Sequence, residues 1–291
     1  MPAPGAAESD QLRRDLAGDA AQQTIAEITR LDGVALRIRL AGAPVCAPHL
    51  SLILGAALGR EHPSIHDVAY DEALGLAHSA TVVTVLADTP ADRAGLRAGD
   101  VILAVNGRAV AKPWQVYEEL RKRREATDLR IRRGAEPATI RLEPVVGCGF
   151  EVEYVPDPSL ATGRALHGHA FVTAGFVRFV RSDDELAIVI SHELAHRILD
   201  DETRAGFLEH ELDADRIGLY LAARAGYDVA VAPDLWERVA IEKPWMIRFE
   251  PGPMSDELEP IHARIGKRVP ALRRLVAEIR DKQARGGDLV P

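Results

Sequence analysis

Apolar positions follow a helical period in four stretches of the chain. SDDELAIVISHELAHRIL, residues 182–199, predicts one helix that is apolar enough to be buried, and Ser182 with Glu185 three residues later forms a capping box at its start. GFLEHELDADRIGLYLAARAG, residues 206–226, predicts a second helix. Residues 8–31 and 261–285 predict amphipathic helices near the two ends of the sequence.

Alternation of apolar and polar residues predicts strands elsewhere. VALRIRL at 34–40 is typical of a half-buried strand, set off from the preceding helix by a glycine. FEVEYVP at 150–156 predicts a further strand. Between these two predicted strands of the chain, residues 81–110 predict two further strands with a short turn of helix. Residues 113–124 predict a helix. The motifs LRIRR and ATIRL then predict a hairpin.

Composition narrows the class of protein. A chain of 291 residues that is 47% hydrophobic can bury a sizeable core and suits two domains. A net charge of −8 gives no electrostatic case for nucleic acid or an anionic membrane. The longest clean apolar run, at 50–58, is too short to span a bilayer, and the first residues show no signal peptide.

The two cysteines, Cys46 and Cys148, lie on either side of the middle segment. A disulfide there would pin an inserted domain to its host, whereas two unrelated buried thiols are the alternative. The disulfide interpretation favours an exported, periplasmic type of protein whose native signal is absent from this sequence, and the alternative is a cytoplasmic one.

Histidine and carboxylate spacing predicts a metal centre. His192 and His196 are four residues apart on one helix, so both can offer an imidazole nitrogen to one ion. Glu193, about 100° round the helix, is placed to take a proton from metal-bound water. Glu211 is the predicted third ligand, and Asp215, one turn later, the acceptor that orients a ligand imidazole.

Other interpretations of these residues stay open. His210 is a rival third ligand, although it lies about 100° from Glu211 on the same helix. A closed structural zinc site or a histidine pair without metal would use the same two histidines. The class that continues the motif with a glycine and a third histidine is excluded by residues 197–201, RILDD.

HELAH at 192–196 and ELDAD at 211–215, preceded by a G-x-x-FVT segment and RSDDELA, resemble the HtpX-like and CAAX-prenyl-protease metallopeptidases, a gluzincin family. The resemblance covers residues 151–226. It implies a zinc ion held by the two histidines and the first glutamate of ELDAD, with Glu193 as general base. The sequence departs from the family at Leu160-Ala161, where relatives have Asn-Ala, and in lacking transmembrane helices.

The same resemblance suggests where a substrate lies. Ala170, Phe171, Val172 and Thr173 match the family's exposed edge strand, which pairs with an extended polypeptide. His262 or Arg264 are candidates to stabilise the oxyanion, with surface positions as the alternative. The loop histidines His167 and His169 are candidate substrate contacts, and residues 240–260 a candidate cover for the cleft.

Residues 95–100, GLRAGD, and Asn106-Gly107 resemble a bacterial PDZ domain of the type attached to quality-control proteases. Such domains bind extended peptides by strand addition and capture a terminal carboxylate in a loop. Leu74, Gly75 and Leu76 are the candidate loop. Composition does not separate a peptide-binding PDZ domain from one that spaces or gates.

These observations predict an α+β protein with a gluzincin-type peptidase domain and an inserted, mostly-β PDZ domain. The expected divisions are 1–65, packing on the peptidase domain, 66–146 for the PDZ domain, and 147–291 for the peptidase domain with a C-terminal helix. The predicted function is zinc-dependent endopeptidase activity in protein quality control, acting on polypeptides that are unfolded or bound through their C-termini. The alternative is a PDZ-based adaptor with a structural or latent zinc site.

Overall fold

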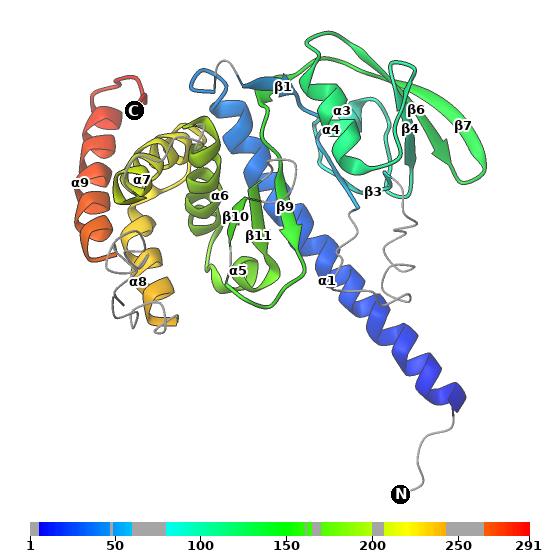
Figure 1. The fold of residues 1–291 in the computed structure, drawn as a ribbon, viewed down its shortest axis with the longest axis horizontal. Helices are drawn as coiled ribbons and strands as arrows, with labels where there is room; N and C mark the ends of the chain where they lie inside the picture. Colours follow the sequence, from blue (N-terminus) through cyan, green and yellow to red (C-terminus); the bar gives the residue numbers. More distant parts are fainter. Residues whose placement is uncertain are drawn as a thin grey trace, which may run out of the picture.

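The computed structural model describes residues 6–46, 49–59, 80–160, 162–164, 170–199, 207–242 and 265–291. Buried side chains form two separate hydrophobic cores, one for each domain. Figure 1 shows the helical domain beside a smaller sheet domain, with a long helix, α1, running along both. Among the described residues, no helix is long and apolar enough to cross a membrane.

In the helical domain, the other helices pack around α6 (Asp183–Ile198) and bury its apolar residues. These helices are α1 (Ala6–Ala41), α5 (Ala174–Phe179), α7 (Phe207–Arg224), α8 (Ala232–Glu242) and α9 (Ile265–Ala284), with a short 3₁₀ turn η2 (Val229–Val231). A three-stranded sheet of order β10-β11-β9 completes it, with β9 at Val152–Val155, β10 at Thr162–Arg164 and β11 at Ala170–Thr173.

The second domain has a four-stranded antiparallel sheet of order β5-β4-β6-β7 and a two-stranded sheet β2-β3. Its elements are β2 (Ala56–Leu58), β3 (Val82–Val85), α3 (Pro90–Arg93), β4 (Val101–Val105), β5 (Arg108–Ala109), α4 (Pro113–Arg121), β6 (Thr127–Arg133) and β7 (Glu136–Leu142). The predicted short helix, the later helix and the hairpin all form close to their expected positions.

The two domains join at a double-stranded neck. β1 (Leu50–Leu52) enters the small domain and pairs antiparallel with β8 (Val146–Cys148), which leaves it. Cys46 and Cys148 form a fully buried disulfide at the base of this neck, across a sequence separation of 102. Of the two interpretations left open for these cysteines, the structure has the disulfide, which ties the ends of the inserted domain together.

The predicted strand at 34–40 is wrong, because these residues continue α1 to Ala41 without a break. The buried side chains are Leu31, Val34, Ala35 and Ile38, a spacing of three, four and seven that belongs to a helix. Gly33, expected to end the helix, lies inside it, and a β-carbon added there would have no neighbour within 4 Å. This part of α1 packs against α6, as the prediction that the N-terminal segment covers the peptidase domain requires.

The predicted boundary at residue 66 also needs correction. Leu52, Leu54, Ala56 and Leu58 pack in the core of the small domain, although the prediction assigned them to the N-terminal segment. Leu52 ends β1 and Ala56 and Leu58 lie in β2, and each of these strands is only three residues long, too short for a clear alternating pattern. The small domain therefore begins with β2 at the latest.

The helix α6 begins as the sequence predicts, with one difference. Ser182 is the N-cap, and its hydroxyl accepts a hydrogen bond from the backbone N–H of Glu185. The Glu185 carboxylate accepts from the backbone N–H of Arg181 instead of that of Ser182, and it pairs with both Nη atoms of Arg238 on α8. The cap thus also fixes α8 against the start of α6.

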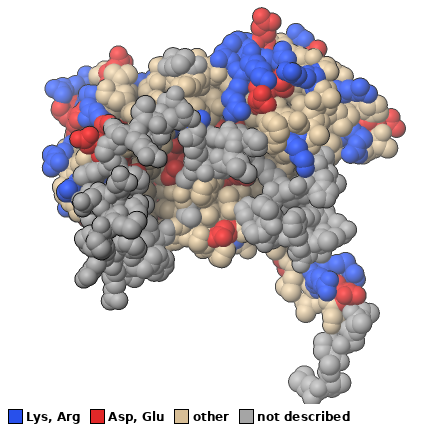
Figure 2. All heavy atoms as spheres, viewed as in Figure 1, with Lys and Arg blue, Asp and Glu red and all other residues tan. Residues whose placement is uncertain are grey.

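Basic residues at the end of α4 pair with two glutamates of the same helix, of which Glu118 is partly exposed and Glu119 is buried. Lys122 pairs with Glu118 and Glu119, and Arg123 lies 3.5 Å from Glu119. Figure 2 shows blue side chains gathered over the small domain with red ones interspersed. The partly exposed pair of Lys122 with Glu118 contributes little to stability.

Candidate metal centre

Close packing of α6 and α7 brings the predicted ligands together. Gly218 on α7 lies against the backbone of His192, and a β-carbon added to Gly218 would be 3.0 Å from the backbone nitrogen of His192. Ala214 and Ala222, both fully buried, lie on the same helix. Small residues allow two helices to approach closely, so the α7 carboxylates reach the α6 imidazoles.

Three donor side chains converge at this contact. The Nε2 atoms of His192 and His196 are 3.1 Å apart. Oε2 of Glu211 lies 3.5 Å from the first of these nitrogens, and Oε1 lies 3.5 Å from the second. Ligand atoms of all three residues lie within 4.8 Å of one another, and His210 does not belong to this group. Two imidazoles and one carboxylate form a donor set that suits zinc and leaves a coordination position open.

Asp215 lies behind the histidines. Its Oδ1 is 3.0 Å from the Nδ1 of His192, on the side of the ring away from the converging Nε2 atoms. A carboxylate in this place holds the imidazole with Nε2 directed at the ion. The structure thus brings the Asp215 carboxylate next to His192, and its role as the residue that orients this ring stays a prediction.

A buried arginine, which the sequence analysis missed, completes the site. Arg268 on α9 is 2% exposed, and it donates from Nε and Nη2 to the two oxygens of Asp215 at 2.8 and 2.7 Å. Its Nη1 lies 2.9 Å from Oε2 of Glu211. The ring of Trp236 on α8 lies 4.4 Å from this guanidinium and 5.4 Å from the His192 ring. Arg268 thus connects the predicted ligand with the predicted orienting residue.

These contacts shift the pKa values of three side chains in the site. Burial alone would lower the pKa of His192, but Asp215 and Glu211 outweigh it and raise that pKa to about 9. Burial would raise the pKa of Glu211, yet contact with His192 and the charge of Arg268 lower it to about 2. The pKa of Asp215 is likewise lowered to about 2, against burial, chiefly by Arg268. Both carboxylates are therefore charged and able to hold cations at neutral pH.

Glu193 is partly exposed, next to the predicted ligand His192 on α6. Burial lowers the pKa of Arg268, whereas Asp215, Glu211 and Glu193 together raise it, so the Glu193 carboxylate lies near the same cluster. A carboxylate that is open to solvent beside a metal donor set has the position that a general base needs.

The expected substrate strand is placed differently from the prediction. Ala170–Thr173 forms β11, but β11 is the central strand, paired antiparallel with β10 and parallel with β9. Its backbone is occupied on both sides, so it is not an edge strand. The edge on the side away from β9 is β10, which also lies near α6. A three-residue strand with a glycine at its centre gives little signal in a sequence.

Several predicted residues lie outside the described residues, namely Leu74, Gly75, Leu76, His167, His169, His262 and Arg264. Arg268 and Trp236 are the residues that the sequence analysis missed. For Arg268 a signal existed, since it stands four residues before Leu272 and seven before Leu275 and so occupies the apolar face of α9. Trp236 lies in α8, for which the sequence analysis named no element.

Comparisons with known proteins agree with the two domains. Residues 81–133 match a PDZ domain, and residues 150–210 match peptidase family M48. Over 91 residues, 31% of this chain, the sequence is 38% identical to "Serine protease HTRA2, mitochondrial" of Bos taurus, covering 18% of that protein. Over 139 residues, 36% of this chain, it is 30% identical to "Mitochondrial metalloendopeptidase OMA1" of Arabidopsis thaliana, covering 28% of that protein.

Among solved structures, the chain is similar to the "Crystal Structure of the HtrA3 PDZ Domain Bound to a Phage-Derived Ligand (FGRWV)". The match has 24% identity and a TM-score of 0.27, and it covers 34% of this chain and 88% of the other. The chain spans less than a third of the curated relatives that it matches. It carries a PDZ domain and a domain of peptidase family M48.

Proposed function

We propose that this chain, which joins a PDZ domain to a peptidase domain of family M48, is a zinc-dependent endopeptidase. The observation that carries the proposal is the convergence of two imidazoles and one carboxylate, with the Nε2 atoms 3.1 Å apart and a glutamate beside them. His192, His196 and Glu211 would hold one zinc ion. A zinc ion bound there would polarise the scissile carbonyl and lower the pKa of water.

The residues of the chain then divide the remaining work. The Glu193 carboxylate takes a proton from the attacking water and delivers it to the nitrogen of the leaving amine. Asp215 holds the His192 ring through Nδ1, 3.0 Å away. Arg268 keeps Asp215 and Glu211 in place with contacts of 2.7–2.9 Å, so it is a positioning residue. No covalent intermediate is needed.

We place the substrate along β10. Its outer edge is unpaired among the described strands, and it lies near the helix that carries the histidines. An extended polypeptide that pairs with this edge would present its carbonyl groups to the centre in a regular array. β11 then acts as the support of this strand, because it pairs with Thr162, Gly163 and Arg164.

Protein quality control is the role that we assign to this activity. The support for it is the resemblance of the PDZ segment to those of quality-control proteases and the presence of a second domain able to select polypeptides. The proposal predicts that unfolded chains are cleaved faster than folded ones. To test this point, we would measure cleavage of casein, and of one globular protein both in its reduced, unfolded form and in its native form.

The experiment that tests the proposed function compares wild type with Glu193→Gln for zinc content and casein cleavage. We expect one zinc per chain in both proteins and cleavage by the wild type alone. His192→Ala should lose both zinc and cleavage. Arg197→Gln, a neighbouring change on α6 outside the donor group, is the matched control. If both proteins bind zinc and neither cleaves, the site is structural or latent; if neither binds zinc, the ligand assignment is wrong.

A further inference from the structure

The indole ring of Trp236 on α8 lies between two members of the candidate metal centre. Trp236 is 7% exposed. Its ring centroid lies 4.4 Å from the guanidinium carbon of Arg268 and 5.4 Å from the ring centroid of His192, with the two rings inclined by 64°. The buried Nε1 of Trp236 makes no hydrogen bond with the described residues. The position of the ring therefore depends on contacts of its faces and edges.

The helix α8 is fixed against both neighbouring parts of the centre. Its buried side chains follow a spacing of three, four and seven, as on one helix face, and are Ala232, Leu235, Trp236 and Val239. Arg238 pairs with Glu185 at the start of α6, at 2.7 and 2.9 Å. Glu237 accepts a hydrogen bond of 2.7 Å from Arg273 of α9. The helix that carries Trp236 is thus tied to the helix of His192 and to the helix of Arg268.

The guanidinium of Arg268 uses its edges for two carboxylates at once. Nε and Nη2 donate to Asp215, and Nη1 lies 2.9 Å from Oε2 of Glu211. The donor atoms of a guanidinium lie in one plane, so its faces take no hydrogen bond and suit an aromatic ring. Among aromatic side chains, indole attracts a cation most strongly. The ring of Trp236 is therefore the kind of partner that this cation still needs.

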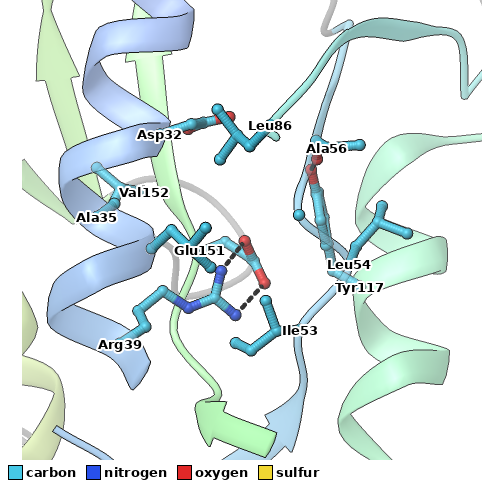
Figure 3. A pocket seen from close by; sticks show the side chains of 12 residues that line it. Asp32, Ala35, Arg39, Ile53, Leu54, Ala56, Leu86, Tyr117, Glu151 and Val152 are labelled. Carbon is cyan, nitrogen blue, oxygen red and sulfur yellow. Dashed lines mark hydrogen bonds and ion pairs between the residues drawn. The ribbon is translucent and has the colours of Figure 1, made fainter. Parts of the chain in front are cut away.

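Arg39 on α1 provides a contrast, because it is also buried but binds a single carboxylate. Its Nη1 and Nη2 donate to the two oxygens of Glu151, both at 2.8 Å (Figure 3). One bidentate partner fixes the plane of such a guanidinium. Arg268 instead divides its donors between two residues that stand one turn apart on α7, so its orientation has to satisfy both of them.

We infer that Trp236 is a positioning residue of the proposed zinc site. Its ring holds the guanidinium of Arg268 in the orientation that binds Asp215 and Glu211 together. Through these two carboxylates it fixes the predicted third ligand and the residue behind His192. Its contact with the His192 ring also limits rotation of that ring. The inference rests on the zinc-binding part of the proposed function and assigns Trp236 no contact with substrate.

The zinc affinity of the full chain, measured by competition with a chelating dye, tests the inference. Trp236→Leu should weaken zinc binding at least about tenfold, whereas Trp236→Phe, which keeps an aromatic face, should weaken it no more than about threefold. Tyr227→Leu is the matched control, because the guanidinium of Arg37 also lies 4.4 Å from the ring of Tyr227, which is 6% exposed and outside the donor group. This control should change the zinc affinity less than about twofold. Equal affinities of wild type and a folded Trp236→Leu would overturn the inference.

Ring fluorination separates the π face of Trp236 from its shape. Fluorine withdraws electron density from the indole and changes its volume little, so it weakens a cation–π contact and leaves the packing nearly unchanged. In a chain with Trp114→Phe and Trp245→Phe, Trp236 is the only tryptophan. Its zinc affinity should fall stepwise through mono-, di- and trifluorotryptophan. The absence of a trend would overturn the inference, and this series gives the answer if Trp236→Leu does not fold.

A double-mutant cycle in the zinc-free protein identifies the partner of the ring. Urea unfolding followed by far-UV circular dichroism measures stability without the tryptophan signal. Trp236→Leu combined with Arg268→Met should lose less stability than the two single variants together, because each change removes the same contact. Additive losses would mean that the ring only fills the core, and they would overturn the inference. The cycle needs no metal, whereas failure of the proposed function appears in the wild type as missing zinc or missing casein cleavage.

Discussion

Replacing Arg268 by Met should destabilise the zinc-free peptidase domain by about 3–5 kcal/mol, because the change leaves Asp215 and Glu211 with only the charged His192 imidazole as a cationic partner. Arg268 is 2% exposed and holds Asp215 through two hydrogen bonds of 2.7 and 2.8 Å. It also lies 2.9 Å from Glu211. Met keeps most of the aliphatic volume against Trp236, so the loss reports the charge and its hydrogen bonds more than a cavity.

Urea unfolding of the zinc-free protein at pH 7, followed by tryptophan fluorescence, measures this loss. Arg273→Met is the matched control, since Arg273 lies on the same helix in an exposed pair with Glu237, with side chains 61% and 43% exposed. That control should cost under about 1 kcal/mol. The double variant Arg268→Met with Asp215→Asn should lose less than the two single variants together. A loss at Arg268 no larger than at Arg273, or full additivity with Asp215, would refute the reasoning.

Three further changes have defined outcomes. Burial would raise the pKa of Glu185, but its arginine partner on α8 and a backbone N–H hold it below the usual 4.5, so Glu185→Gln should destabilise the protein at pH 7. The difference from wild type should shrink as the pH falls below about 4, as acid titration with circular dichroism can measure. Gly218→Val should separate α6 and α7 and weaken zinc binding at least tenfold by competition with a chelating dye, whereas Gly33→Ala, in open space, should not. Cys46→Ser with Cys148→Ser should lower thermal stability by up to about 4–5 kcal/mol, because the closed loop spans 102 residues.

The predicted metal donor set depends on short-range spacing, and the structure brings its members together. His192 and His196 share a face because they are four residues apart on one helix, and Glu211 stands in a second helix whose glycine and alanines allow close approach. The spacing of residues in such a motif already specifies which side chains share one face of the helix. Its prediction needs only that the two helices form and pack.

The wrong strand at 34–40 shows where a short window fails. Val34, Leu36, Ile38 and Leu40 alternate with other residues and so fit a period of two. Counted over a longer stretch, the residues that are buried in α1, Leu31, Val34, Ala35 and Ile38, fit a helix. The arginines expected on the exposed face of a strand instead reach across to other elements, Arg37 to the carbonyl of Ala225 and Arg39 to Glu151.

Contacts between distant parts of the chain could not be predicted in the same way. Arg268 is 53 residues from Asp215, and nothing local to either residue specifies the pair. The order of the β9–β11 sheet likewise depends on a parallel pairing between β9 and β11 and on the short edge strand β10. Such features follow from tertiary packing, so a single sequence shows only that a charged residue stands on an apolar face.

The PDZ domain is attached to the peptidase domain at two places, and the two attachments differ in kind. At the neck, the disulfide and the β1–β8 pairing hold both ends of the insert. Along α1, the domains meet through Thr29, whose hydroxyl oxygen lies 3.2 Å from that of Thr84 on β3, and through Ala35 and Leu36, which line a small pocket together with Ile53 and Leu54. A neutral hydrogen bond is worth about 1 kcal/mol. The neck is therefore the covalent attachment of the two, and the attachment along α1 consists of non-covalent contacts.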